Sequence, residues 1–403
     1  MLVLVVNAGS SSMKSQLLDT EGPKCLMKTV AEAIGTDLAH ITVKVGSEKV
    51  IDRDLGLDVS VAQSLGILLD FLQNDEKSPV SSIDEIKGIG NRVVSGGEYF
   101  AESVLVTDDS LEKVKICGAL APLHNPHAAA CVELSRSILP DVPQVFVFDN
   151  AFHMTMPPKA YRYAIPKKYY TDMAIRRYGA HGTSHRYAAQ KGAEAIGMNV
   201  EDANIITCHV GNGGSISAVS GGKCIDTSMG LTPLEGIMMG TRCGSIDPAI
   251  VVYIMQKEGK TPEEMDHLMN FESGLLGVSG VDSDMRAVEE AANNGNEDAK
   301  LALEMYVYRI QKVIGSYFAI MDHTDCVVMT AGIGENSDII REQVFAGLEH
   351  LGMKIDKEKN AGRVGDDVYK VVSADDSPVK IVVVAADEEL QIAKDTERIV
   401  NAL

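Results

Sequence analysis

The chain opens with a short, continuous apolar run, Leu2–Val6, and a polar turn of Gly9 and three serines separates this run from a second extended stretch at 13–18. Apolar runs bounded by turn residues predict buried strands, so we expect a strand, a tight turn and a second strand. Such a turn lets backbone N–H groups approach an anion, and Asn7 and Lys14 flank it with an amide and a positive charge. The turn is suited to hold phosphate, although an ordinary hairpin with a serine-rich loop has the same pattern.

The same plan recurs later in the chain. Residues 205–219 again read as an apolar strand, a turn of glycine, asparagine and serine, and a second apolar strand. A third element, 326–336, runs from a buried strand through a glycine-rich loop into a helix-like stretch whose N-terminus could face a nucleotide. Two phosphate-type hairpins about two hundred residues apart indicate two related halves that hold one nucleotide between them.

Between these elements, strands alternate with helices. The pattern predicts two or three strands within 24–54 and further strands at 87–94, 145–148, which ends on Asp149, and 379–386. Helices are expected at 60–72, 107–117, 124–138, 247–257, 262–270, 296–322 and 388–400. The first and the fifth of these begin with capping boxes, Ser60/Gln63 and Thr261/Glu264. This alternation implies an α/β layer structure with ligands at the strand ends.

Length and composition add the domain count and exclude several partners. A chain of 403 residues is long for one core, and Met156-Pro-Pro158 interrupts regular structure, so we place a domain boundary near residue 150. A formal net charge of −20 argues against nucleic-acid and acidic-membrane partners. The seven cysteines contain no C-x-x-C pair and predict reduced thiols, and the sequence lacks a signal peptide and a membrane-length apolar stretch. We therefore expect a cytoplasmic protein.

Several motifs carry a family resemblance: the N-terminal hairpin, Arg92-Val-Val, 121–126, 147–153, 176–185, 230–236, 240–242 and 332–336. With these motifs in order over nearly the whole chain, the sequence resembles the acetate kinase family, which belongs to the larger group of sugar kinases, Hsp70 and actin. The resemblance implies an α/β protein of two domains with a duplicated actin-like, ribonuclease H-like ββαβ-type fold and an interdomain nucleotide cleft. It implies an N-terminal domain at 1–150 joined by the C-terminal helix 387–403, a nucleotide-binding and dimerisation domain at 151–386, and a homodimer.

The resemblance also implies an activity and a set of site residues. The activity is reversible in-line transfer of the ATP γ-phosphoryl group to acetate, which gives acetyl phosphate and ADP and depends on Mg²⁺, with Mn²⁺ as an alternative. The implied catalytic residues are Asp149, His181 and Arg242, the substrate-binding residues Arg92, Val94, Leu123, Ala180 and Pro233, and the metal-binding residues Asn7 and Glu388. The implied nucleotide-binding residues are Lys14, His209, Val210, Gly211, Asn212, Gly213, Asp284, Met285, Arg286, Gly332, Ile333, Gly334, Glu335 and Asn336.

Elementary chemistry limits the roles of these residues. Carboxyl groups titrate near pH 4 to 4.5, so an acetate-type acceptor is already ionised at neutral pH and needs no general base. Asp149 therefore orients Mg²⁺ or its waters in our interpretation, although a turn-capping role has the same position in the sequence. Two like charges about 4 Å apart at an effective dielectric near 20 repel by roughly 4 kcal/mol, so the site needs cations. Arg92 and Arg242 are the candidates, with His181 donating a hydrogen bond to the phosphoryl oxygens.

The sequence departs from the family pattern mainly at three positions, with milder changes at Asn150 and Asp387. Asn91 and Ser95 stand where the family usually has histidines beside Arg92, and Ala180 stands where it usually has a phenylalanine that walls the substrate methyl. A larger pocket would admit propionate or butyrate, since each buried CH₂ contributes about 0.8 kcal/mol. Methionines such as Met154 or Met156 could instead fill the space.

Two other function classes fit parts of this sequence. A sugar kinase would share the fold, but its pocket would need several hydrogen-bonding groups where this chain has an arginine and apolar side chains. A nucleotide-binding regulator without turnover would fit the missing histidines, but the retained polar site residues argue against it. Activity with short carboxylates, with sugars, or with neither separates the three classes.

Overall fold

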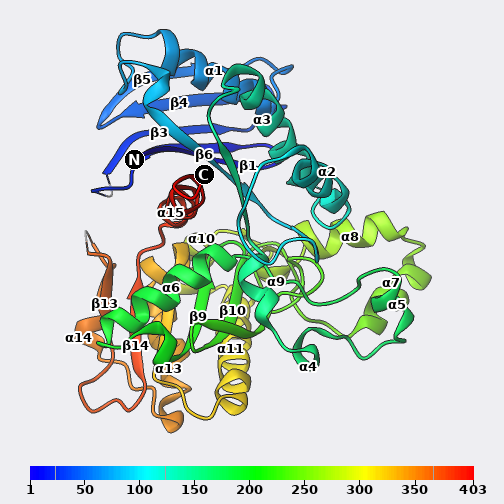
Figure 1. Ribbon diagram of the computed structural model, residues 1–403. Coiled ribbons are helices and arrows are strands. Elements are labelled where there is room, and N and C mark those ends of the chain that lie inside the picture. The colour runs from blue at the N-terminus through cyan, green and yellow to red at the C-terminus, as the bar shows by residue number, and fades with distance from the viewer. Residues whose placement is uncertain (23, 123, 366) are drawn as a thin grey trace. The chain divides into compact units, whose positions relative to one another are not determined.

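The computed structural model describes the chain except for residues 23, 123 and 366. Leu123, which we predicted to line the substrate pocket, therefore lies outside the described residues. The chain forms two compact units. The first contains Met1–Phe152 and Asp387–Leu403, and the second contains His153–Ala386. Each unit is built around one β-sheet and is described separately (Figure 1).

The first unit contains an eight-stranded sheet in the order β5-β4-β3-β2-β1-β6-β8-β7. Its strands are β1 (Leu2–Ala8), β2 (Met13–Asp19), β3 (Lys24–Glu32), β4 (His40–Val45), β5 (Glu48–Asp54), β6 (Ile86–Val93), β7 (Val104–Leu105) and β8 (Gln144–Phe148). Strands β1 to β5 pair antiparallel in sequence, whereas β6 and β8 run parallel to β1. The stretch predicted to hold two or three strands thus holds three.

Helices cover both faces of this sheet. They are α1 (Val61–Asn74), α2 (Asp108–Ile116), α3 (Asn125–Ile138) and α15 (Glu388–Val400). Leu4 and Val6 of β1 pack in one core with α1, while Val3 and Val5 pack in another with Ile392 of α15. The opening run is continuously apolar because both of its faces are buried.

Glycines on β6 let α15 lie close to the sheet. A Cβ atom at Gly90 would lie 2.5 Å from Thr396 Oγ1 and 2.7 Å from Ile392 Cγ2, closer than any side chain tolerates. A Cβ at Gly88 would also meet Thr396, at 2.9 Å. These contacts, with Ile392 and Thr396, fix the middle of α15 against the first sheet.

The second unit repeats the strand plan of the first. Its six-stranded sheet has the order β11-β10-β9-β12-β14-β13. The strands are β9 (Asn204–Val210), β10 (Gly214–Ser220), β11 (Lys223–Thr227), β12 (Cys326–Thr330), β13 (Tyr369–Val371) and β14 (Lys380–Val384). As in the first sheet, an antiparallel hairpin leads to two parallel strands and an antiparallel edge strand. This repeated order confirms the prediction of a duplicated α/β fold.

The larger helices of the second unit are α6 (Gly182–Ala195), α7 (Pro248–Glu258), α8 (Pro262–Phe271), α10 (Met285–Asn293), α11 (Glu297–Ile320) and α13 (Asp338–Ala346), and the short helices are α4 (Pro158–Tyr161), α5 (Lys168–Thr171), α9 (Gly274–Ser279), α12 (Ala331–Asn336) and α14 (Lys357–Asn360). In this unit, α6 packs on one face of the sheet and α11 on the other, α10 and α13 pack on α11, and α7 and α8 contact each other. Cys208 and Val210 of β9 pack with α10 and α11, whereas the alternate residue Thr207 contacts α6. Thr207 and His209 therefore face α6, and Cys208 and Val210 face α11.

The structure corrects one prediction about the glycine-rich stretch after β12. We expected a loop there, but the strand passes directly into α12, whose first residue, Ala331, has a φ of 66°. The turn that a loop would have made is absorbed by this one left-handed residue. Both predicted capping boxes, Ser60/Gln63 and Thr261/Glu264, are present at their helices.

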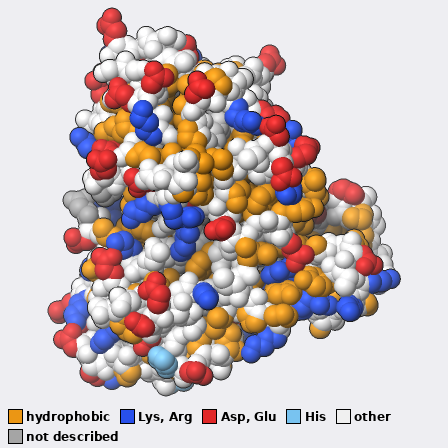
Figure 2. All heavy atoms as spheres, in the orientation of Figure 1, with side chains coloured by type: hydrophobic (Ala, Val, Ile, Leu, Met, Phe, Trp, Pro, Cys, Tyr) orange, Lys and Arg blue, Asp and Glu red, His pale blue; other side chains and the backbone are white. Residues whose placement is uncertain are grey.

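The face of the molecule drawn in Figure 2 carries its negative charge in a dispersed form. Figure 2 shows carboxylates scattered over the visible face, with lysines and arginines among them. Among the helices that the structure describes, no segment has both the length and the apolar character needed to cross a membrane.

Candidate functional site

The parallel strands of the first sheet bring three predicted site residues to one edge. β1 pairs with β6 so that Val6 lies beside Asn91, and β6 pairs with β8 so that Val93 lies beside Phe148. Because these strands run in the same direction, their carboxyl ends meet. Asn7 near the end of β1, Arg92 near the end of β6 and Asp149 just after β8 therefore lie together.

Arg92 is the centre of this group. Its Nε and Nη2 donate to the two carboxylate oxygens of Asp149 at 3.0 and 2.6 Å, and its Nη1 donates to Oδ1 of Asn7 at 3.1 Å. The Asp149 side chain is 1% exposed and that of Arg92 is 19% exposed. A guanidinium has five N–H groups, so this arrangement holds Arg92 with three of them and leaves two for an anion.

Glu388 and Lys14 complete the polar group of the first unit. Lys14 lies opposite Asn7 in the β1/β2 register, and Glu388 is the first residue of α15. Burial raises the pKa of Glu388 to about 7, with Asp149 and Glu389 adding to the shift and Arg92 and Lys14 opposing it. Burial by itself would lower the pKa of Arg92, but the charges of Asp149 and Glu388 outweigh burial and raise it.

The oxygen donors of this group fit a divalent cation of the magnesium type. Asn7 contributes an amide oxygen. Asp149 and Glu388 contribute carboxylates that are close enough for the charge of Asp149 to raise the pKa of Glu388. Among the described residues, no cluster of three or more histidine, cysteine or acidic side chains is placed to hold a metal ion. Mg²⁺ commonly binds one or two carboxylates and keeps waters and substrate phosphates as its other ligands. The residues present match that pattern.

The second unit holds a cavity of about 750 Å³. It is lined by Gly211, Asn212, Ser283, Asp284, Met285, Arg286, Glu289, Gly332, Ile333, Asn336, Ser337, Asp338 and Ile339. Eight of these are predicted nucleotide-binding residues from three separate stretches of the chain. A cavity of this size matches the 300–1,000 Å³ typical of small-molecule sites.

Two of the predicted nucleotide residues have supporting positions. Gly334 is buried in α12 with its Cα side against Met329, and Glu335 accepts a hydrogen bond from the backbone N–H of Ala386 at 3.0 Å. Burial raises the pKa of Glu335. The sequence reasoning missed Ser283, Glu289 and Ser337–Ile339, and only the capping serine Ser337 before α13 gave a signal.

Asp284 and Arg286 form one structural unit at the mouth of the cavity. Asp284 caps α10 by accepting from the N–H of Arg286, and the Arg286 guanidinium donates to both of its carboxylate oxygens, at 3.0 and 2.5 Å. The hydrogen bonds from Arg286 lower the pKa of Asp284 to about 2. The Arg286 side chain is 88% exposed, so it can contact a ligand from the solvent side.

His181 lies beside His209 on the α6 face of the second sheet. It precedes α6 with a left-handed φ of 58°, and its ring stacks on that of His209 at 4.0 Å between centroids. Its Nδ1 lies 2.9 Å from Ser215 Oγ, and His209 Nδ1 lies 2.8 Å from Ser184 Oγ. A left-handed backbone is uncommon outside glycine and often marks a functional position.

The side chains of Arg242 and His181 both lie close to Gly213. A Cβ atom on this glycine would lie 3.6 Å from Arg242 Nη1 and 3.8 Å from His181 Nε2. Arg242 Nη1 donates to the Pro233 carbonyl at 3.1 Å, and among the described residues no carboxylate forms an ion pair with it. Burial lowers the pKa of Arg242, and its charge stays uncompensated and available to an anion.

The residues predicted to wall the substrate methyl are divided between the units. Ala180 is buried in a small cluster with Met229 and Met239, and this cluster does not include Met154 or Met156, which were named above as side chains that could fill the space. Val94 directly follows β6 of the first unit. The methionines beside Ala180 supply flexible apolar bulk where the family usually has a ring.

The two positions that lack the family's histidines do not face Arg92. Asn91 is buried on the opposite side of β6, where its Nδ2 donates to Gln144 Oε1 at 3.2 Å. Ser95 is buried too, and its carbonyl accepts from Asn125 Nδ2 at 2.8 Å. The replacement of histidine at Asn91 therefore reaches Arg92 only through the packing of β6.

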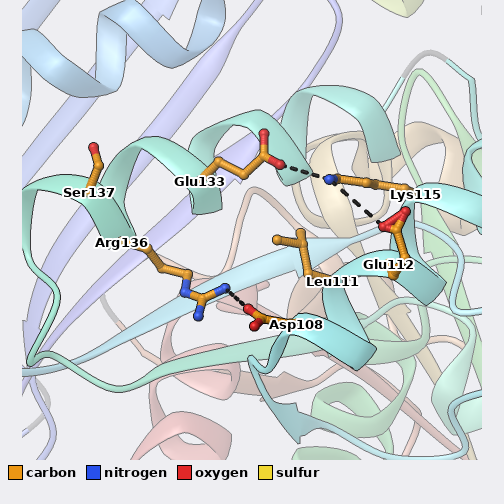
Figure 3. A pocket seen from close by; sticks show the side chains of 7 residues that line it. All are labelled: Asp108, Leu111, Glu112, Lys115, Glu133, Arg136 and Ser137. Carbon is orange, nitrogen blue, oxygen red and sulfur yellow. Dashed lines mark hydrogen bonds and ion pairs between the residues drawn. The ribbon is translucent and has the colours of Figure 1, made fainter.

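A second cavity, of about 520 Å³, lies between α2 and α3 and contains none of the predicted site residues. Figure 3 shows that most of its lining side chains are already paired: Arg136 with Asp108, and Lys115 with Glu112 and Glu133. These exposed pairs are ordinary features of a surface between two helices.

Comparison with known proteins agrees with the motifs. The model of the acetokinase family matches residues 2–394. The chain belongs to the acetokinase family. It is 50% identical over 409 residues to an acetate kinase of Thermotoga maritima, with all of both chains covered. It is also 49% identical, again over all of both chains, to an acetate kinase of Thermoanaerobacterium thermosaccharolyticum.

Solved structures of the family have the same fold. An acetate kinase from Porphyromonas gingivalis aligns with a TM-score of 0.92 at 42% identity over 99% of both chains. A propionate kinase from Francisella tularensis aligns with a TM-score of 0.91, also at 42% identity, over 98% of this chain and 99% of its own. The predicted family resemblance is confirmed. The two solved structures, one named an acetate kinase and the other a propionate kinase, are equally similar to this chain by identity, whereas the two sequence relatives at 50% and 49% identity are both acetate kinases.

The raised pKa of Glu388 generates a stability prediction. Because this pKa lies above its ordinary value of 4.5, the contribution of the protonated carboxyl to folding is fully present below pH 4.5 and is lost as the pH rises through about 7. A neutral amide avoids this loss. Glu388→Gln should therefore raise the melting temperature relative to the parent protein more at pH 8.5 than at pH 5.5.

Thermal unfolding of the full chain in metal-free buffer at both pH values measures this difference. Glu112→Gln is the control, because Glu112 is 65% exposed on α2 and its replacement removes the same charge from the surface. A Glu388→Gln effect that is equal at the two pH values would contradict the buried, proton-linked carboxyl.

Proposed function

We propose that this protein is an acetate kinase, which reversibly transfers the γ-phosphoryl group of ATP to acetate and gives acetyl phosphate and ADP. Arg92 is the observation that carries the proposal. Asp149 and Asn7 fix its guanidinium and leave two N–H groups for a carboxylate. Apolar Val94 follows it by two residues, which suits a short acyl chain rather than a sugar. The family relatives named above support the same reaction.

Phosphoryl transfer to a carboxylate requires neutralisation of negative charge rather than removal of a proton. A carboxylate acceptor is already a nucleophile at neutral pH, and the obstacle is its repulsion by the phosphoryl group. In the proposal, Arg92 binds the acceptor while Arg242 and His181 stabilise the phosphoryl oxygens in the transition state. Catalysis of phosphoryl transfer is mostly positioning and electrostatic stabilisation of this kind.

For the nucleotide, the second-unit cavity is the proposed site. Its lining supports contacts of Asp284, Met285 and Arg286 with the adenosine and of the α12 residues around it. The turn after β9, with His209 to Gly213, is the proposed phosphate-binding segment, and Lys14 is its counterpart in the first unit. Backbone N–H groups of such glycine turns bind phosphate oxygens.

Asn7 and Glu388 are the proposed protein ligands of Mg²⁺, with Asp149 orienting the ion or its waters. When bound, the ion would neutralise phosphate charge. Both oxygens of Asp149 already accept from Arg92, so the same carboxylate links the acceptor-binding arginine to the proposed metal site.

Propionate or butyrate is the alternative substrate. Ala180 in place of the usual phenylalanine favours a larger pocket, while Met229 and Met239 beside it favour acetate by filling the space. The similarity to the propionate kinase from Francisella tularensis keeps this alternative open. A catalytically weak nucleotide-binding regulator is a further alternative.

One experiment tests the function. ATP-dependent acyl phosphate formation is trapped with hydroxylamine, and kcat/KM is measured for acetate, propionate and butyrate, with glucose phosphorylation assayed in parallel. We expect acetate to exceed propionate by tenfold or more. Equal or higher kcat/KM for propionate or butyrate would make the protein a kinase of longer carboxylates. Sugar phosphorylation alone, or no product with any acceptor, would reject the carboxylate kinase.

We further propose a cytoplasmic homodimer. The seven cysteines are free, in keeping with a reducing compartment. None of the eleven residues of α7, all of them described, is buried, although the helix is rich in apolar side chains. Val252 and Tyr253 are 54% and 61% exposed. A helix with this composition and this much exposed apolar surface is typical of a covered interface, and a second copy of the chain is the proposed partner.

Loss of the Arg242 charge should strongly slow the reaction. By analogy with arginine residues that stabilise phosphoryl-transfer transition states, Arg242→Ala should lower kcat about 10³-fold. Steady-state kinetics measure this change, and Arg286→Ala, at an exposed arginine of the nucleotide cavity, should mainly raise KM for ATP. A loss of less than tenfold in kcat for Arg242→Ala would remove Arg242 from the transition state.

Asp149→Asn tests the metal role. The amide keeps one oxygen but replaces the other with a donor that faces Arg92 Nη2 or Nε, so both Arg92 and the metal are disturbed. We expect the Mg²⁺ concentration for half-maximal rate to rise by about tenfold or more, as for other residues that orient metal ligands. An unchanged Mg²⁺ titration together with a raised KM for acetate would instead restrict Asp149 to holding Arg92.

The interface proposal predicts that Val252→Asp produces a monomer. A buried, unpaired carboxylate at an interface costs several kcal/mol, enough to dissociate a typical dimer. Sedimentation velocity reports the mass directly. Leu57→Asp is the control, because Leu57 is 62% exposed in the first unit and lies outside α7. A parent protein that sediments as a monomer would reject the dimer.

A further inference from the structure

A chain of hydroxyl and imidazole groups lies behind His181 in the second unit. His185 of α6 contacts Thr207 Oγ1 of β9 through Nδ1 at 2.7 Å and Ser215 Oγ of β10 through Nε2 at 2.7 Å. The same Ser215 Oγ lies 2.9 Å from Nδ1 of His181. His185, Thr207 and Ser215 are completely buried, so these groups depend on one another for hydrogen bonds.

The single hydroxyl proton of Ser215 couples the tautomer of His181 to that of His185. The Ser215 hydroxyl has one proton and can donate it to only one of the two ring nitrogens that contact it. The other nitrogen must then carry its own proton and donate to Ser215. The tautomer of a neutral His185 therefore decides whether Nδ1 of His181 is a donor or an acceptor.

Thr207, the last group in this series of hydrogen bonds, indicates the direction in which the hydrogen bonds run. Thr207 Oγ1 lies 2.7 Å from Nδ1 of His185 and 3.4 Å from the Ser217 carbonyl, which can only accept, and we assign the Thr207 proton to that carbonyl as part of the proposal below. Thr207 then accepts from Nδ1–H of His185, Ser215 donates to Nε2 of His185, and Ser215 accepts from Nδ1–H of His181. Burial lowers the pKa of His185 well below its ordinary value, with His153 and His209 adding to the shift, so His185 stays neutral.

We propose that Thr207, His185 and Ser215 are positioning residues that hold the proton of neutral His181 on Nδ1. The neutral ring then presents Nε2 as an acceptor, and His181 donates from Nε2 to a phosphoryl oxygen only when it is a cation. The use of this arrangement rests on the proposed phosphoryl transfer, whereas the tautomer itself does not.

The groups that face His181 set when it becomes charged. His209 stacks on the ring from β9, Arg242 lies across Gly213, and neutral His185 lies behind Ser215. The positive charge of Arg242 opposes a second cation beside it, whereas the phosphates of a nucleotide favour one. A bound anionic phosphate therefore favours the cationic form of His181, which is the form that donates from Nε2 in this proposal.

Nuclear magnetic resonance of the full chain labelled with ¹⁵N-histidine tests the tautomer without any turnover. At pH 8 and without nucleotide, a long-range ¹H–¹⁵N correlation shows which ring nitrogen carries the proton, and His181→Gln identifies the signals. We expect protonated Nδ1 and bare Nε2 in His181. A proton on Nε2 of neutral His181 would overturn the proposal, and so would a spectrum of Ser215→Ala in which the His181 signals keep the parent tautomer ratio.

The pH dependence of kcat provides the second readout. In the parent protein, kcat should fall tenfold per pH unit above the pKa of bound His181, since the neutral ring has no proton on Nε2. In Ser215→Ala the neutral ring is free to place its proton on Nε2, so this alkaline fall should become shallower even though kcat is lower. A lower kcat with an unchanged profile would reduce Ser215 to a packing role.

Thr227→Val is the matched control. Thr227 is also a fully buried hydroxyl of this sheet, but its Oγ1 bonds to Ser217 Oγ at 2.8 Å and not to an imidazole. It should leave both the His181 tautomer and the shape of the pH profile unchanged, and a shift equal to that of Ser215→Ala would overturn the proposal. If no carboxylate is phosphorylated at all, the proposed function fails while the tautomer experiment still decides this inference.

Discussion

The register of the parallel strands is the constraint on which the rest of the structure depends. Once β1, β6 and β8 pair in parallel, their carboxyl ends share one edge, and Asn7, Arg92 and Asp149 meet there. A slip of one residue in β6 would turn Arg92 to the opposite face and bring Asn91 in its place. Gly88 and Gly90 of β6 face α15, where no Cβ atom fits, and Ile89 packs in the core on the other face, so the packing prevents such a slip and fixes the geometry of the site.

The two arginines of the proposed reaction are supported in opposite ways. Arg92 is fixed by a carboxylate, which holds its orientation firmly and offsets part of its charge. Arg242 is held through the Pro233 carbonyl, and its charge is not offset by any carboxylate of the described chain. A chain with a net charge of −20 thus keeps one cation for positioning and another for attracting negative charge.

Buried polar groups also shape the nucleotide cavity from outside. Arg341 is fully buried, and its guanidinium donates to the carbonyls of Gly334 and Glu335 at the end of α12 and to Asn360. Carbonyl groups at the end of a helix need such donors when water is absent. This arginine satisfies them and so fixes the short helix that carries Gly332, Ile333 and Asn336 into the lining.

The sequence by itself determined the element order, both capping boxes, the duplicated α/β plan and the family, because these follow from local patterns and from motifs. It could not show that Arg92 joins Asn7 to Asp149, that methionines 229 and 239 pack beside Ala180, or that α12 replaces a loop. Those features depend on contacts between distant segments, which only the tertiary structure decided. The series of hydrogen bonds that links Thr207, His185 and Ser215 to His181 is the clearest case. Three separate elements supply these groups, and no local sequence pattern predicts that they contact one another.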